Sequence, residues 1–238
     1  MIPKKIHYCW FGRGEKPKLA QKCINSWYKY CPDYEIVEWN ENNFDVNYNA
    51  YTRYCYDNKK YAFLSDYVRL IIIEENGGIY FDTDVELIKS LDFILDNEAF
   101  LGFESDSYVN TGLGFGGVAH HRMLKALISE YDILLDGKQG VITCPELNTR
   151  ALLRFGLEKN GKMQNIEGVQ IYPREFFNPY DDPTGRLIKT KNTVSIHWYS
   201  KSWMSKDMII RSKITKPLHR IFGVDCFRWI KQRKKRKS

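Results

Sequence analysis

Two aspartates, Asp82 and Asp84, follow a glycine pair and a short apolar segment in the sequence NGGIYFDTDVELI. In a continuous strand their side chains would share one face, roughly 6–7 Å apart at the β rise per residue. A turn at Thr83 would instead let both carboxylates converge on one cation. Carboxylate oxygens are hard ligands that suit Mg²⁺ or Mn²⁺, and such ions leave positions open for phosphate oxygens. The acidic pair is therefore a candidate metal site for a reaction in which a diphosphate departs.

A second charged pair, Asp66 and Arg69, lies three residues apart in the apolar segment AFLSDYVRLIII. On the surface of a helix such a pair would contribute only about 0.2–0.5 kcal/mol. Because the segment is apolar on nearly all sides, we expect the pair to be partly buried. Buried charges need specific partners, and a polar ligand such as a sugar would supply them.

The segment VSIHWYSKSW places His197 at the end of a predicted strand and Ser200, Lys201 and Trp203 after it. These side chains offer a metal ligand, a hydroxyl group, a positive charge for phosphate and an aromatic lid. A lone histidine at a strand end is more often structural, and only the following pattern favours metal ligation.

Further upstream, Asn110 precedes a glycine-rich stretch in SYVNTGLGFGG, where the backbone can approach a ligand closely. Glu146 and Asn148 would either face an acceptor or simply cap a helix. His120 and His121 stand at a predicted helix start, and we interpret them as structural.

The elements that must position these residues alternate between strand and helix, which predicts an α/β domain whose strand ends bind ligands. Strands are predicted for KKIHYCWFG, YEIVEWN and, interrupted by three polar residues, IYFDTDVELI. Helices are predicted over 17–31 and 60–76, and the second ends at Gly77-Gly78. Weaker patterns predict strands over 99–103, 112–118, 169–172 and 193–197, helices over 120–135 and 145–157, and a loop in PREFFNPYDDPTG.

Composition indicates a globular chain, because 43% of the 238 residues are hydrophobic and 27% are charged. The longest aliphatic run, Leu70 to Ile73, is far shorter than the roughly 18 residues of a membrane span. MIPKKIHYCWFG lacks a signal-peptide pattern, so we predict a cytoplasmic protein. The six cysteines form no CxxC pair, which predicts reduced, packed thiols.

Positive charge is concentrated at the C-terminus. Eleven of the 36 Lys and Arg residues but only one of the 29 acidic residues lie from Arg211 onward, which leaves 25 basic and 28 acidic residues before it. This basic segment also contains Phe222, Phe227, Trp229 and Ile230. An amphipathic segment of this composition favours an anionic membrane surface over nucleic acid, although a solvated tail remains open.

Three segments in order, IHYCWFG, KYAFLSDYVRL and NGGIYFDTDVEL, resemble the DXD sugar-binding glycosyltransferases of family 32, which include yeast mannosyltransferases and bacterial capsule enzymes. They resemble the clostridial glucosylating toxins more distantly. The resemblance implies a GT-A-like Rossmann-type nucleotide-sugar-binding domain over 1–205, with a mixed, mostly parallel central sheet. A basic amphipathic helical tail over 206–238 would follow.

The resemblance also implies roles for individual residues. Trp10 should stack on the donor base, Asp66 and Arg69 should hydrogen-bond the donor sugar and its ribose or phosphate side, and Tyr80 should line the nucleotide site. Asp82 should contact ribose and metal, while Asp84 and His197 should ligate Mn²⁺ or Mg²⁺. Ser200, Lys201 and Trp203 should surround the diphosphate, and Asn110 should lie on the reacting side of the sugar. Asp66, Arg69, Asn110 and Lys201 form the expected catalytic set.

The expected reaction is transfer of a hexosyl group from a nucleoside diphosphate sugar, most simply a UDP sugar, with retention of configuration. The acceptor would be a saccharide or a lipid-linked saccharide in surface polysaccharide synthesis, at the cytoplasmic face of the membrane. Because no carboxylate stands out as a covalent nucleophile, we expect front-face displacement, in which the leaving phosphate helps to deprotonate the acceptor.

Two other functions fit parts of the pattern. IYFDTDV also matches the DxDx[TV] signature of haloacid-dehalogenase-type phosphatases, in which Asp82 would be the nucleophile and Asp84 a general acid. That signature normally comes early in a chain, and it leaves Trp10 and the His197 segment without a role. A carbohydrate-binding or membrane-surface module with Ca²⁺ in the acidic turn ranks third, since it does not explain two separate ligand segments.

Overall fold

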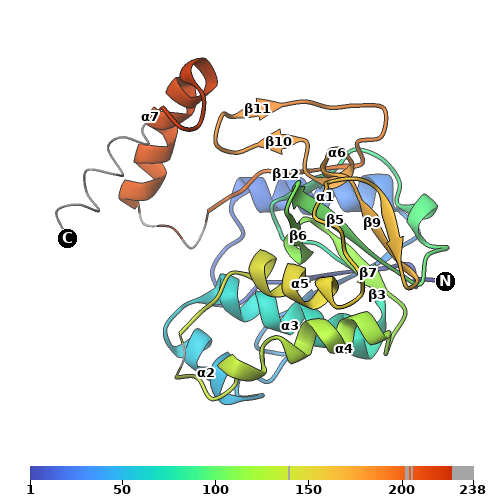
Figure 1. The fold of residues 1–238 in the computed structure, drawn as a ribbon. Coiled ribbons are helices and arrows are strands. Elements are labelled where there is room, and N and C mark those ends of the chain that lie inside the picture. Colours follow the sequence, from blue (N-terminus) through green and yellow to red (C-terminus); the bar gives the residue numbers. More distant parts are fainter. Residues whose placement is uncertain (139, 202–203, 205, 227–238) are drawn as a thin grey trace.

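A mixed β-sheet separates two groups of helices in the computed structural model, which describes residues 1–138, 140–201, 204 and 206–226 (Figure 1). Within these residues the sheet order is β2-β1-β3-β7-β5-β9-β8, with β6 paired to β5. The strands are β1 (Lys5–Cys9), β2 (Glu35–Trp39), β3 (Gly78–Tyr80), β5 (Ala99–Ser105), β6 (Tyr108–Asn110), β7 (Phe115–Gly117), β8 (Gln164–Ile166) and β9 (Val169–Tyr172).

Most strands of this sheet run in one direction, as expected. β2, β1 and β3 pair in parallel, and so do β5 and β9. β7 lies antiparallel between β3 and β5, so both of these neighbours share the direction of β1. β6 and β8 are also reversed. The predicted α/β class with a mixed, mostly parallel sheet is confirmed.

Each face of the sheet carries a hydrophobic core. One core gathers side chains from α2 (Ala50–Asp57), α3 (Tyr61–Asn76), α4 (Arg122–Ser129) and α5 (Cys144–Leu153). The other gathers side chains from α1 (Lys18–Tyr30) and α6 (Arg174–Phe177). Trp27 of α1 is fully buried there, and its indole N–H donates to the Val85 carbonyl at 2.8 Å.

The predicted interrupted strand IYFDTDVELI is divided between two sheets. Its first part is β3 in the central sheet, and its second part is β4 (Val85–Leu87), which pairs antiparallel with β12 (Ser195–His197). The chain changes sheets through a turn at Thr83, where the Val85 amide donates to the Asp82 carbonyl at 3.0 Å. This change of sheet brings the C-terminal strand beside the acidic pair.

Several boundary predictions need correction. The strand predicted over 112–118 begins only at Phe115, because 111–113 form a 3₁₀ turn. The helix predicted over 120–135 begins at Arg122 and ends at Ser129, with a 3₁₀ turn following. The predicted loop PREFFNPYDDPTG contains α6 and β10 (Tyr180–Asp181), which forms a hairpin with β11 (Arg186–Leu187). α2, β6 and β8 were not predicted.

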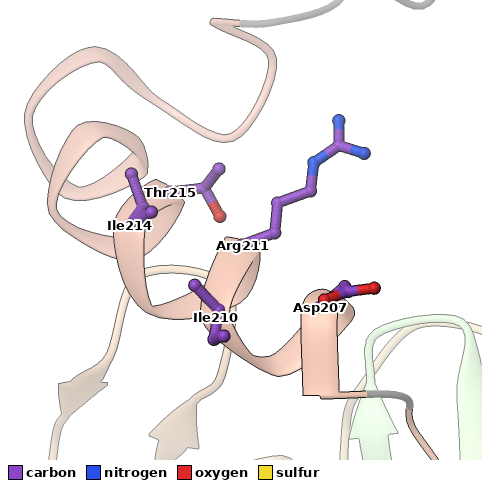
Figure 2. A pocket seen from close by; sticks show the side chains of 5 residues that line it. All are labelled: Asp207, Ile210, Arg211, Ile214 and Thr215. Atoms are coloured by element: carbon purple, nitrogen blue, oxygen red, sulfur yellow. The ribbon is translucent and has the colours of Figure 1, made fainter.

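The expected helical tail is present as α7 (Lys206–Phe222), which lies beside the β10–β11 hairpin (Figure 1; Figure 2 shows side chains along it). Phe227, Trp229 and Ile230 lie outside the described residues, and the division at residue 206 stays a prediction. Among the described residues, no helix has both the length and the apolar character that crossing a membrane requires. The described cysteines are free thiols, as expected.

Candidate active site

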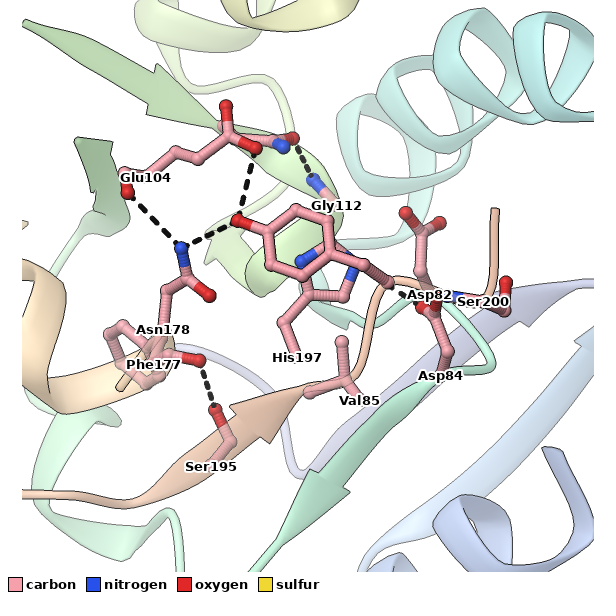
Figure 3. Close-up of polar contacts among 12 residues, drawn as sticks. Asp82, Asp84, Val85, Glu104, Gly112, Phe177, Asn178, Ser195, His197 and Ser200 are labelled. Atoms are coloured by element: carbon pink, nitrogen blue, oxygen red, sulfur yellow. Dashed lines mark hydrogen bonds and ion pairs between the residues drawn. The ribbon is translucent and has the colours of Figure 1, made fainter. Parts of the chain in front are cut away.

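Asp82, Asp84 and His197 form one cluster although more than a hundred residues separate the acids from the histidine. One ligand atom from each lies within 4.8 Å of the others. Antiparallel pairing of β4 with β12 places His197 opposite Val85, and the His197 Nε2 atom lies 3.3 Å from Asp84 Oδ1 (Figure 3). The Ser200 amide donates to Asp84 Oδ2 at 2.6 Å. The structure therefore brings the three predicted metal ligands together.

The electrostatics of the cluster suit a cation. Burial raises the pKa of Asp84, but the His197 imidazole and the Ser200 amide outweigh burial and hold this pKa below its ordinary value. Burial lowers the pKa of His197, but the neighbouring Asp84 outweighs it and raises this pKa. When His197 is protonated it supplies positive charge where a metal ion would, and a metal ion that takes Nε2 as its ligand must displace that proton.

The donor set and its surroundings fit a divalent metal. Two carboxylates and one imidazole are suitable ligands for Mn²⁺, and the carboxylates suit Mg²⁺. Asp84 and His197 are buried, whereas the Asp82 side chain is 30% exposed and leaves one side of the cluster accessible. The buried His197 Nδ1 atom has no hydrogen-bond partner among the described residues.

Arg69 connects this cluster to the second predicted pair. Its guanidinium, 2% exposed, pairs with Asp66 and lies 3.4 Å from Asp82 Oδ2. The Tyr80 ring stacks beneath it, with 5.0 Å between the guanidinium carbon and the ring centroid, and the Tyr80 hydroxyl donates to Asp82 Oδ1 at 3.2 Å. The expectation of a partly buried pair is confirmed. Removing one member of a buried ion pair typically costs about 3–5 kcal/mol.

Burial also acts on the carboxyl group of Asp66. It raises the pKa of Asp66 to about 6, against the opposing effect of Arg69. The Tyr131 hydroxyl donates to the Asp66 carbonyl at 3.3 Å, so both side chain and backbone of this residue are held in place. Asp66 is therefore a preorganised hydrogen-bond acceptor above about pH 6.

Gly112 is the close-approach position that the glycine-rich segment suggested. A Cβ atom there would lie 2.4 Å from Asp82 Oδ2 and 3.0 Å from a guanidinium nitrogen of Arg69. The Gly112 amide donates to Asn110 Oδ1 at 2.6 Å, and the Cys144 thiol donates to the same oxygen at 3.2 Å. The backbone at Gly112 therefore lies against the side chains of Asn110, Arg69 and Asp82 and has no room for a side chain of its own.

Trp10 follows β1 at the edge of the sheet where β3 leads into the acidic turn. Its indole N–H donates to the Gly14 carbonyl at 2.7 Å, and the Lys16 ammonium lies 5.7 Å from the ring. The half-buried ring borders a polar depression together with Glu38 and Asn40. Stacking of a base on Trp10 stays a prediction.

Ser200 and Lys201, which follow β12, make different contacts. Ser200 reaches Asp84 through its backbone amide. The Lys201 ammonium pairs with Asp182 at 2.7 Å and donates to the Ser212 hydroxyl at 2.8 Å, and its contact with phosphate stays a prediction. Trp203 lies outside the described residues.

Three residues behind His197 were not predicted. The Tyr199 ring packs on the imidazole with 4.0 Å between centroids, at a backbone φ of 51°. The Tyr199 hydroxyl donates to Glu104 Oε1 at 3.2 Å and accepts from the Asn178 amide at 2.7 Å (Figure 3). Asn178 itself is fully buried. This network fixes the ring that faces His197.

Three of the other candidates, Asn148, His121 and His120, make structural contacts. Asn148 is buried and donates to the Thr111 hydroxyl at 3.0 Å, whereas Glu146 is exposed in the first turn of α5. His121 caps α4 by accepting from the Met123 amide at 3.2 Å, as its predicted place at a helix start suggested. His120 pairs with Glu74.

The mixed sheet and the Asp82–Asp84–His197 cluster agree with the GT-A-like fold that the sequence resemblance implied. Residues 17–101 match a family described as the glycosyltransferase sugar-binding region containing the DXD motif. This segment holds Asp66, Arg69, Asp82 and Asp84. The comparison agrees with the expected DXD glycosyltransferase but does not assign family 32.

Curated relatives agree with this match. A human alpha-1,4-N-acetylglucosaminyltransferase is 38% identical over 121 residues, and inositol phosphoceramide mannosyltransferase 3 of Schizosaccharomyces pombe is 34% identical over 126 residues. Each alignment covers 48% of this chain and 33% of the relative, so it spans about a third of the relative's length. These matches support the prediction of a glycosyltransferase.

A solved structure supports the fold. The structure described as PaToxG glycosyltransferase superposes with a TM-score of 0.50 at 18% identity, over 64% of this chain and 69% of that one. At this identity the likeness concerns the fold, which is the GT-A-like architecture expected from the sequence.

Proposed function

We propose that this protein is a metal-dependent, retaining glycosyltransferase that moves a hexosyl group from a nucleoside diphosphate sugar, with UDP as the nucleotide, to a saccharide or lipid-linked saccharide acceptor in surface polysaccharide synthesis. One observation carries the proposal: the DXD carboxylates and His197 meet in one cluster with ligand atoms within 4.8 Å. The match of residues 17–101 to the DXD family supports it independently.

Asp82, Asp84 and His197 would hold a Mn²⁺ or Mg²⁺ ion, which when bound neutralises the charge of the departing diphosphate. The chain's own contribution is to keep these ligands in place before the donor arrives. The Ser200 amide fixes the Asp84 carboxylate, and Tyr80 and Arg69 fix that of Asp82. Such preorganisation avoids reorientation during the reaction.

Asp66, Arg69 and Asn110 would bind the donor sugar. Asp66 accepts from sugar hydroxyl groups when it is ionised, and the planar guanidinium of Arg69 suits ribose or phosphate oxygens. Asp66 and Arg69 pair with each other, and the Asn110 side chain accepts from the Gly112 amide, so all three groups are already oriented. Holding the anomeric carbon in register with the acceptor hydroxyl is the positioning contribution to catalysis.

Retention follows in this proposal from front-face displacement. The acceptor hydroxyl attacks on the face from which the diphosphate departs, and a phosphate oxygen receives the hydroxyl proton. The Asp66 carboxylate is bound by Arg69 and therefore positions the sugar in this scheme rather than forming a covalent bond to it.

A thermal-shift screen tests the donor and metal requirement. UDP and GDP sugars are compared with and without Mn²⁺, because the two curated relatives are named for different sugars. We expect metal-dependent stabilisation by UDP sugars that Asp84→Ala abolishes and that the exposed-site control Asp57→Ala retains. Stabilisation by GDP sugars alone would show that the nucleotide is GDP and not UDP. Metal-dependent stabilisation that persists in Asp84→Ala would refute the metal site. The anomeric configuration of the product, read by NMR, tests retention.

The haloacid-dehalogenase-type phosphatase is not favoured. Asp82 would have to act as a free nucleophile, but Arg69 and Tyr80 both engage its carboxylate. Asp84, the required general acid, is held in its ionised form because its pKa is lowered. Hydrolysis of p-nitrophenyl phosphate should therefore be absent.

A further inference from the structure

α7 presents a row of apolar side chains to solvent. Ile210, Ile214, Pro217 and Ile221 are spaced by four, three and four residues, so they lie along one side of the helix. The three isoleucines are 56%, 63% and 72% exposed. Figure 2 shows Ile210 and Ile214 on successive turns beside a shallow hollow that Asp207, Arg211 and Thr215 also line. We name Ile210, Ile214, Pro217 and Ile221 the α7 stripe.

Polar contacts, not the α7 stripe, attach this helix to the β10–β11 hairpin. The Lys216 ammonium donates to the Tyr180 hydroxyl and pairs with Asp182, both at 2.9 Å. Arg186 donates to the Arg220 carbonyl at 2.9 Å. A surface helix normally buries its apolar stripe against the core. Here the helix is held by its polar side, which leaves the α7 stripe for another partner.

Positive charge flanks the α7 stripe. Arg211, Lys213 and Arg220 are all exposed, and Asp207 is the only acid within the helix. The sequence then adds seven Lys and Arg residues and no acid between 227 and 238. An apolar row bordered by cations is the pattern of a helix that lies in the interface of an anionic membrane.

We propose that the α7 stripe inserts into the headgroup region of an anionic membrane, while Arg211, Lys213 and Arg220 contact lipid phosphates. The same spacing would also suit pairing with a second copy of α7. In such a pair, however, these cations would face one another, and like charges destabilise the contact. Anionic headgroups would instead attract these cations.

The contact would place the membrane near the candidate active site. Lys201, which follows the Asp84-binding Ser200, reaches Ser212 of α7. This contact connects α7 directly to the segment that carries His197 and Ser200. Membrane binding goes beyond the proposed function and does not depend on glycosyl transfer. An experiment can therefore refute either proposal without refuting the other.

Co-sedimentation of the full chain with vesicles tests the proposal. Vesicles of phosphatidylcholine alone are compared with vesicles that contain about one third phosphatidylglycerol, so that charge is the variable. The double variant Ile210→Asp, Ile214→Asp removes the apolar stripe. Ile133→Asp is the matched control, because Ile133 is 53% exposed but lies in the 3₁₀ turn after α4. Thermal melting confirms that each variant is folded.

We expect the wild type and Ile133→Asp to bind anionic vesicles, and the double variant to bind at least about tenfold more weakly. Arg211→Gln with Lys213→Gln should reduce both the affinity and its sensitivity to salt. Failure of the wild type to bind, or equal binding by the double variant, would overturn the proposal. It would likewise be overturned if the wild type dimerised without vesicles in sedimentation velocity and the double variant did not.

Discussion

Gly112→Ala tests whether the sugar-binding residues depend on a backbone position without a side chain. The new Cβ would lie 2.4 Å from Asp82 Oδ2, whereas an ordinary contact begins at 3.4 Å, so the carboxylate must move by about 1 Å. Gly112 does not have a positive φ, and the substitution therefore adds crowding without backbone strain. A displacement of about 1 Å at a catalytic group can cost about a hundredfold in rate.

The assay is transfer from the nucleotide sugar together with donor binding by calorimetry. We expect kcat/KM to fall about a hundredfold and donor affinity to weaken, while the protein still folds, because the Asp82 side chain is 30% exposed and has room to shift. Gly117→Ala is the contrast, since its Cβ meets Ala99 and the Glu98 carbonyl at 3.3 Å within the sheet. That variant should lose stability and keep donor affinity. Unchanged transfer by Gly112→Ala would refute the reasoning.

Three further outcomes are expected. Donor affinity should fall about tenfold per pH unit below about pH 6, because burial raises the pKa of Asp66 to about 6 and only the ionised carboxylate accepts from sugar hydroxyls. Calorimetry measures this affinity, and the Asp66→Asn variant should lack the pH dependence. Burial lowers the pKa of His7 to about 4, so the unfolded chain binds a proton between pH 6.5 and 4 that the folded one does not. Stability should therefore fall by about 3 kcal/mol as the pH drops through this window, and denaturant unfolding of His7→Gln should show a smaller loss. Finally, Tyr199→Leu should weaken Mn²⁺ binding about tenfold or more, whereas Tyr199→Phe keeps the ring on His197 and should bind Mn²⁺ nearly as well as the wild type. If an EPR titration gives Tyr199→Leu the Mn²⁺ affinity of the wild type, Tyr199 does not position His197.

The first half of the sheet was predictable because local signals are strong there. Gly77, at a φ of 63°, ends α3 as the glycine pair indicated, and β1, α1 and β2 follow clear changes of hydrophobic period. α2 was missed because its sequence AYTRYCYD has no clear apolar period, although Asn49 and Thr52 form a capping box at its start.

Site residues that belong to a sequence motif were predicted, whereas residues that act only through contacts between distant segments were not. The Asp82-Asp84 pair and His197 each carry a recognisable pattern, and the two segments meet because β4 pairs with β12. Tyr199 and Asn178 carry no such pattern. Their role depends on a positive φ at Tyr199 and on a hydrogen bond between residues twenty-one positions apart.

The most direct test of the account is a Mn²⁺ titration of the full chain, followed by EPR in the presence of UDP. Wild type should bind a single ion tightly, and His197→Ala and Asp84→Asn should each lower the affinity by about a hundredfold, because each removes a ligand of the same site. His120→Ala, at a histidine that pairs with Glu74 outside the cluster, should bind as the wild type does. Wild-type affinity in His197→Ala would contradict a metal site shared between the acidic turn and the C-terminal strand.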